Sequence, residues 1–154
     1  MSVERVVDSL GYVSFEQAER LKNLGFRQPV RAAYLKEVNW ENPQKNKTVF
    51  IHNDKMRMSH LCDHNSNTGG IGKIFYSAPS QLQVQDWLFK QNKILISAEP
   101  HVYQDCTVEW EGHIIDLRSG KPLFYSLADY YETSREEALN VCIDTALTLI
   151  EDER

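Results

Sequence analysis

The chain has 154 residues, a net charge of −5, 42% hydrophobic residues and 10% aromatic residues. This length and composition are typical of one globular domain with a sizeable core, and they exclude a mainly disordered chain. The apolar runs are too short to cross a membrane, and the first residues lack the layout of a signal peptide. The three cysteines are an odd number without close pairing, so we expect a soluble cytoplasmic protein rather than a disulfide scaffold.

Charge is divided unevenly between the two halves of the chain. Residues 1–77 carry 11 Lys and Arg against 8 Asp and Glu, whereas residues 78–154 carry 6 against 14, a net charge of −8. An acidic surface of this kind repels nucleic acid and attracts a basic partner, although the same charges also solvate an ordinary helix face. The first half has no dense cluster of Lys and Arg, so we expect no nucleic acid as a partner.

The first half of the chain predicts one helix and then three strands. These elements cover about residues 14–24, 30–36, 48–52 and 71–76. Ser14 followed three residues later by Gln17 forms a helix-capping pattern, and Gly25 supplies the left-handed residue that ends a helix. The first two strands flank the polar stretch 39–47, which predicts a hairpin. The long polar segment at about 53–72 predicts either a mobile loop or a functional one.

The second half predicts a helix, three strands and a last helix. Their approximate ranges are 78–91, 94–98, 107–117, 122–126 and 134–151. Ser80 with Gln83, and Ser134 with Glu137, repeat the capping pattern of the first helix. The last helix has the clearest apolar stripe, which consists of Leu139, Cys142, Ile143, Ala146, Leu147 and Ile150. Because these residues recur every three or four positions, we expect the last helix to lie on a sheet.

The predicted fold is a single α+β domain over residues 1–154. Its element order is α-β-β-(β)-α-β-β-β-α, in which hairpins are separated by helices. A parallel doubly wound sheet needs single strands that alternate with helices, so this order disfavours it. We expect one antiparallel sheet of about five to six strands, packed by about three helices.

Three stretches of the chain share their pattern with known proteins. They run from Val13-Ser14-Phe15-Glu16-Gln17-Ala18 to Leu24-Gly25-Phe26, from Tyr76-Ser77-Ala78-Pro79-Ser80 to Trp87-Leu88, and from Ser134-Arg135-Glu136-Glu137-Ala138-Leu139 to Ala146-Leu147. Together these stretches, about a third of the chain, resemble a family of small uncharacterised proteins common in bacterial phages and prophages. In that family they look like structural helices, so the resemblance carries over no catalytic residue. It implies a phage-associated origin, and hence host takeover or counter-defence by binding.

The long polar segment contains the densest group of metal-binding residue types. His60, Cys62 and His64 alternate along it, and His52 lies nearby in the sequence. Alternate side chains of an extended segment point to one side, and zinc prefers His and Cys as ligands. The spacing H-x-C-x-H is not an established zinc pattern, and a polar surface loop explains the same residues. Zinc bound by these four residues, in a small metal-dependent hydrolase, is the alternative function.

The three cysteines are expected to have different roles. Cys142 lies inside the apolar stripe of the last helix, where a thiol behaves as a small hydrophobe. A nucleophilic pair formed by Cys62 or Cys106 with His101 or His113 would need a closeness that the sequence does not show.

Aromatic and acidic residues before and within the last helix suggest a partner-binding surface. These residues are Tyr130, Tyr131, Glu132 and Glu136. The carboxylates Glu109 and Glu111 share one strand face, which is more typical of a solvated edge than of an acid–base pair. No nucleotide loop, nucleophile elbow or complete metal-ligand set is present, so no catalytic residue is assigned. We therefore expect a non-enzymatic binding or adaptor protein that acts on a host protein or sequesters a small ligand, without nucleic acid or membrane.

Overall fold

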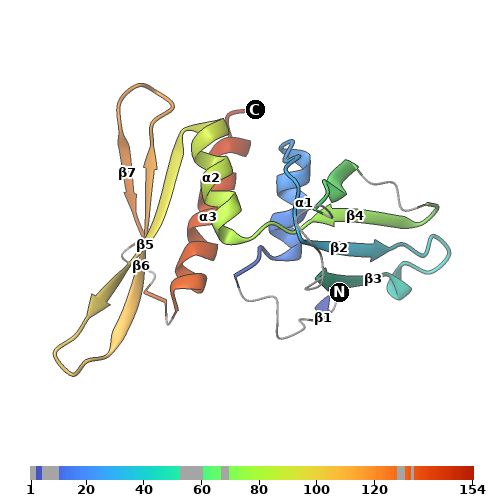
Figure 1. Ribbon diagram of the computed structural model, residues 1–154, viewed down its shortest axis with the longest axis horizontal. Helices are drawn as coiled ribbons and strands as arrows, with labels where there is room; N and C mark the ends of the chain where they lie inside the picture. The colour runs from blue at the N-terminus through green and yellow to red at the C-terminus, as the bar shows by residue number, and fades with distance from the viewer. Residues whose placement is uncertain (1–2, 5–10, 53–60, 67–69, 128–130, 133) are drawn as a thin grey trace. The chain divides into compact units, whose positions relative to one another are not determined.

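The computed structural model describes residues 3–4, 11–52, 61–66, 70–127, 131–132 and 134–154. The chain forms two compact units, Met1–Ser80 and Gln81–Arg154, which we call unit 1 and unit 2 (Figure 1). The α+β class and the predicted order of helices and strands are confirmed. The strands are divided between two sheets. The sequence does not predict this division, because alternation marks a strand but does not specify the strand with which it pairs. No helix in the described ranges is long and apolar enough to cross a membrane.

The described residues of unit 1 form one helix, four strands and two 3-10 turns. They are β1 (Val3–Glu4), α1 (Phe15–Asn23), β2 (Ala32–Glu37), η2 (Pro43–Lys45), β3 (Lys47–His52), η4 (His64–Ser66) and β4 (Lys73–Ser77). The sheet has the order β1-β3-β2-β4. Strand β2 pairs antiparallel with β3, as the predicted hairpin requires, and also with β4. The short strand β1 adds a parallel pairing with β3 that the sequence pattern did not predict.

Helix α1 begins and ends as its sequence predicts. The Ser14 hydroxyl accepts a hydrogen bond from the Gln17 backbone N–H at 3.2 Å, and the Gln17 side chain accepts one from the Ser14 N–H at 3.0 Å. This reciprocal capping box satisfies two backbone donors that the first turn leaves without partners. The ring of Phe15 then packs edge-on against Tyr34 and Tyr76, with centroids 5.6 and 5.2 Å apart. Helix α1 therefore covers one face of the unit 1 sheet.

The described part of the predicted long loop is anchored to unit 1. Asn65 is only 6% exposed. Its side chain donates to the Phe26 carbonyl at 2.9 Å and accepts from the Ser77 N–H at 2.9 Å. The Val30 N–H donates to the Cys62 carbonyl at 3.0 Å. Residues 61–66 are thus held by buried polar bonds, and residues 53–60 and 67–69 lie outside the described ranges.

In unit 2, the residues that the structure describes form a three-stranded antiparallel sheet and two helices. They are α2 (Gln81–Asn92), β5 (Ile94–Val102), β6 (Val108–Asp116), β7 (Leu123–Ser126) and α3 (Arg135–Glu151). The strand order is β5-β6-β7. Both helices lie on the same face of this sheet (Figure 1). Helix α2 begins directly after Ser80, and the hydroxyl of Ser77 accepts a hydrogen bond from the Asn65 N–H.

Helix α3 covers β5 and β6 with the apolar stripe that the sequence predicts. Leu139, Ile143 and Leu147 are at most 2% exposed, and the Ser134 hydroxyl caps the helix by accepting from the Glu137 N–H. The helix lies so close to β6 that a Cβ on Gly112 would come within 2.5 Å of the Cys142 sulfur. A glycine in the middle of this strand therefore permits the close contact between helix and sheet.

Candidate functional site: the open face of unit 2

The unit 2 sheet has a second face, on the side away from α2 and α3. Strand alternation places Ile94, Ile96 and Ile114 under the helices, so the neighbouring residues point to the opposite side. We call that side the open face. Its strand residues are Leu95, Ser97, Glu99, His101, Glu109, Glu111, His113, Ile115, Phe124 and Ser126. The strand register arranges these residues in rows across the sheet.

One end of the open face is apolar. Leu95 lies opposite Ile115, which in turn lies opposite Phe124. Leu95 is 38% exposed and Phe124 is 74% exposed, although both are large hydrophobic residues. Exposed apolar residues that lie next to one another, unlike scattered ones, are typical of interaction surfaces.

The middle of the open face is acidic. Glu99 and Glu111 lie opposite each other, and the Nε2 atom of His113 lies 3.8 and 3.7 Å from their carboxylates. The Ser126 hydroxyl donates a hydrogen bond to Glu111 at 2.5 Å. The hydrogen bond from Ser126 holds the Glu111 carboxylate in position, and His113 lies beside both carboxylates.

The other end of the open face is aromatic. The ring of His101 lies 4.7 Å from that of Tyr103 and 5.8 Å from that of Tyr131, measured between centroids. The Tyr103 hydroxyl donates to the Glu109 carboxylate at 2.6 Å. This hydrogen bond to a charged acceptor raises the pKa of Tyr103 to about 12, so the phenol is neutral at physiological pH.

The structure divides the four residues that the sequence proposed for partner binding. Tyr131 belongs to the aromatic end of the open face. The backbone of Glu132 pairs with Trp110, whose register places it on the helix-covered side. Glu136 lies in the first turn of α3, on that same side, and Tyr130 lies outside the described residues. Because adjacent residues of an extended segment point to opposite faces, the sheet separates Tyr131 from Glu136.

The carboxylates beside Tyr131 are therefore not those of the last helix. They belong to β5 and β6, and Glu109 and Glu111 were interpreted from the sequence only as a solvated edge. Their alternation in the sequence indicates a polar strand face, because every second residue of both strands is polar or small in the middle of the open face. The register that aligns the two strands depends on the whole hairpin, and a pattern in one strand does not specify it.

Cys62 and His64 are the two expected metal ligands that the structure brings into contact. Cys62 Sγ lies 3.3 Å from His64 Nε2, and His60 lies outside the described residues. His52 lies on the face of the unit 1 sheet that α1 covers, with its Nε2 2.8 Å from the hydroxyl of Tyr12. Burial lowers the pKa of His64, which favours its neutral ring. In the ranges that the structure describes, no three His, Cys, Asp or Glu side chains are grouped to hold a metal ion, and zinc binding stays a prediction.

The cysteines of unit 2 have the environments of structural and surface thiols. Cys142 is fully buried, and burial raises the pKa of its thiol to about 11. Its sulfur lies 3.6 Å from the Ser97 carbonyl, consistent with a weak S–H donor inside the core. Cys106 is exposed in the turn between β5 and β6. The structural role that the sequence predicts for Cys142 is therefore confirmed.

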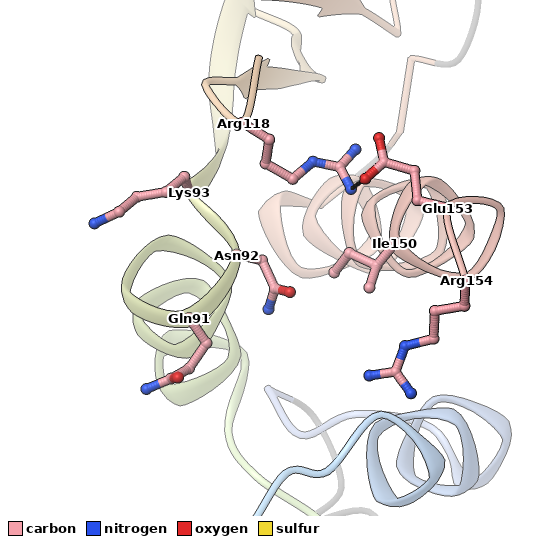
Figure 2. A pocket seen from close by; sticks show the side chains of 7 residues that line it. All are labelled: Gln91, Asn92, Lys93, Arg118, Ile150, Glu153 and Arg154. Carbon is pink, nitrogen blue, oxygen red and sulfur yellow. Dashed lines mark hydrogen bonds and ion pairs between the residues drawn. The ribbon is translucent and has the colours of Figure 1, made fainter. Parts of the chain in front are cut away.

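A pocket in unit 2 lies where α2 and α3 end (Figure 2). Its volume is about 370 Å³, and Arg118 and Lys93 contribute to its wall. Arg118 donates to Asp116 at 2.7 and 2.9 Å and to Glu153 at 2.8 Å. Figure 2 shows Lys93 turned away from the other side chains, with its ammonium 5.5 Å from the Phe89 ring centroid. Because these two cations already interact with groups of unit 2, they are less available to a charged ligand in the pocket.

Comparison of the chain with family models, curated proteins and solved structures gave no match. The open face is therefore interpreted from its own geometry and charge. It combines exposed apolar residues, three carboxylates and a cluster of three aromatic rings on one side of a regular sheet.

Proposed function

We propose that this chain is a non-enzymatic binding protein whose open face binds a basic surface of a partner protein. The observation that carries this proposal is the layout of the face, with carboxylates between an apolar end and an aromatic end. Protein interfaces use apolar and aromatic anchors for affinity, and charged groups for orientation and choice of partner. The open face offers both kinds of group on one surface.

The shape of the open face favours a protein partner over a small substrate. Sites for small molecules are concave pockets that surround most of the ligand. The open face is instead the surface of a three-stranded sheet. Hydroxyl groups of Tyr103 and Ser126 hold the carboxylates of Glu109 and Glu111 in place. A partner meets charges that are already ordered, which lowers the entropic cost of binding.

The sign of the charge favours a basic partner. Unit 2 carries 6 Lys and Arg against 14 Asp and Glu, and the residues that make up the open face include none of the six. Complementary charges raise the rate of association, while buried aromatic groups slow dissociation. The open face should therefore attract a surface rich in Lys or Arg and hold it through its two ends.

We also propose that the partner is a protein of a bacterial host. The support is the resemblance of three helical stretches to proteins of phages and prophages. A phage protein that binds a host protein in the host cytoplasm acts in host takeover or counter-defence. The binding mode and the origin of the partner are separate proposals, because the first depends only on the open face.

The experiment begins with capture and ends with kinetics. Immobilised protein is used to capture partners from a bacterial lysate, and the captured protein is purified and measured by biolayer interferometry. The variants are Glu99→Gln combined with Glu111→Gln, which removes two charges of the open face, and Tyr131→Ala, which removes an exposed ring. The matched control is Glu41→Gln, because Glu41 is an exposed acid of unit 1.

We expect the double charge variant to slow association about tenfold at low salt, in line with electrostatic steering. Added salt should slow association of the wild type and of Glu41→Gln more than association of the double variant. Tyr131→Ala should mainly raise the dissociation rate. A captured protein whose rates are the same for all of these variants would contradict the proposal.

A further inference from the structure

Three aromatic rings gather at one end of the open face, where the β5–β6 hairpin turns. The ring of His101 lies 4.7 Å from that of Tyr103, at an interplanar angle of 69°, and 5.8 Å from that of Tyr131, at 58°. Tyr103 and Tyr131 are 40% and 42% exposed. Rings at these angles do not cover one another face to face, so part of each ring remains available at the surface.

The backbone holds these rings in place. The Tyr103 N–H donates to the Thr107 carbonyl at 3.0 Å, which closes the turn of the hairpin. Tyr131 is followed by Glu132, whose N–H and carbonyl both bond to the backbone of Trp110, at 3.0 and 2.9 Å. Tyr103 and the residue after Tyr131 therefore belong to hydrogen-bonded backbone. Less backbone entropy is lost when a ligand binds there.

Negative charge surrounds the same rings. Glu109 accepts the Tyr103 hydroxyl at 2.6 Å and lies opposite His101 in the sheet register. The next row of the open face contains the carboxylates of Glu99 and Glu111. Ring faces carry partial negative charge, and a cation within about 6 Å of a ring centroid is attracted to them. A carboxylate beside the rings adds to that attraction and repels phosphate groups.

From this arrangement we infer that His101, Tyr103, Tyr131 and Glu109 form a seat for an organic cation, such as the ammonium of a lysine or the guanidinium of an arginine. We call it the aromatic seat. The inference rests on the proposed function and deepens it, because it names the side chain of the partner that the open face receives. The cation lies on the faces of the tyrosine rings, and the Glu109 carboxylate offsets its charge.

The aromatic seat is tested with small probes that need no partner protein. Tetramethylammonium, Nα-acetyl-lysinamide and Nα-acetyl-argininamide are titrated against the full chain by nuclear magnetic resonance at constant ionic strength. The neutral control is Nα-acetyl-glutaminamide. Tetramethylammonium has no hydrogen-bond donor, so it reports ring faces and charge without direct hydrogen bonds. Comparing the lysine and arginine probes shows which cation the seat prefers.

We expect the cationic probes to shift the resonances of residues 101–103, 109 and 131, and the methyl protons of tetramethylammonium to move upfield. Tyr131→Ala should weaken tetramethylammonium binding by about two- to fivefold, the size of a cation–π contribution at an exposed site. Tyr103→Phe keeps the ring and should change this binding by less than about twofold. The matched control is Trp40→Ala, because Trp40 is a 75% exposed ring of unit 1 that is not part of the open face, and it should leave the resonance shifts at the seat unchanged.

Different results would refute the aromatic seat and the proposed protein-binding function of the open face. If the cations bind no better than the neutral probe, or if Tyr131→Ala and Trp40→Ala behave alike, the seat is refuted. That result leaves intact a partner whose association still depends on Glu99 and Glu111. If instead the cations bind at the seat but captured proteins ignore those two carboxylates, the proposed protein-binding function is wrong and the cation site stands alone.

Discussion

Replacing Gly112 by alanine tests how closely α3 approaches the unit 2 sheet. The added Cβ would lie 2.5 Å from Cys142 Sγ and 3.3 Å from the carbonyl oxygen of Ala138. Both atoms belong to a helix whose apolar face is buried, so relief requires α3 or β6 to shift. Overpacking of this kind usually costs about 1–3 kcal/mol of unfolding free energy.

A second effect of the same substitution acts in the opposite direction. Gly112 does not have a positive φ, so alanine fits its backbone conformation. Alanine also has fewer conformations than glycine in the unfolded chain, which stabilises the folded state by about 0.4–1 kcal/mol. We therefore expect Gly112→Ala to lower the free energy of unfolding by about 1.3 kcal/mol, the difference between the midpoints of the two ranges.

The assay is urea unfolding followed by tryptophan fluorescence, to which Trp87 of unit 2, which is 5% exposed, contributes. Gly112→Ala is compared with Cys142→Ala and with the double variant. Because Cys142→Ala removes the sulfur that the new methyl group meets, the double variant should be more stable than the sum of the two single losses by at least about 0.5 kcal/mol. A Gly112→Ala variant as stable as the wild type, or strictly additive losses, would refute the close contact.

Three further predictions concern burial and charge in unit 2. Leu147→Ala should cost about 2–5 kcal/mol in urea unfolding, because Leu147 is fully buried, whereas Leu82→Ala, at a 73% exposed position, should stay within about 0.5 kcal/mol of the wild type; equal losses would place the core elsewhere. Ellman's reagent should modify two thiols of the native protein and reach the third only in denaturant, because burial raises the pKa of Cys142 to about 11; three fast reactions would contradict this burial. The hydrogen bond from Arg118 lowers the pKa of Asp116 below its ordinary 3.8. The ionised Asp116 therefore stabilises the folded state above about pH 3.8, and this contribution is lost as the pH falls through the lowered pKa of the folded state. Asp116→Asn should then be less stable than the wild type at pH 7 and lose less stability on acidification, and parallel curves would remove Asp116 from the acid response.

Local chemistry allowed several elements to be predicted from the sequence alone. The reciprocal bonds between Ser14 and Gln17 depend on a spacing of three residues, so the start of α1 is readable without a tertiary structure. The apolar stripe of α3 repeats every three or four residues over its whole length, and its burial follows from that period. The hairpin of β2 and β3 was also predicted, because it joins strands that are neighbours in sequence.

The tertiary structure decided which segments that are distant in sequence lie next to one another. The sequence identified the strands, but only long-range pairing divided them between two sheets. Tyr131 and Glu136 are near each other in sequence, yet the sheet lies between them, and Tyr131 instead meets His101. The open face exists because the register aligns the carboxylates of β5 and β6, which are separated by a turn. Register is set by pairing of whole strands and packing of one sheet face, neither of which is encoded in a short stretch of sequence.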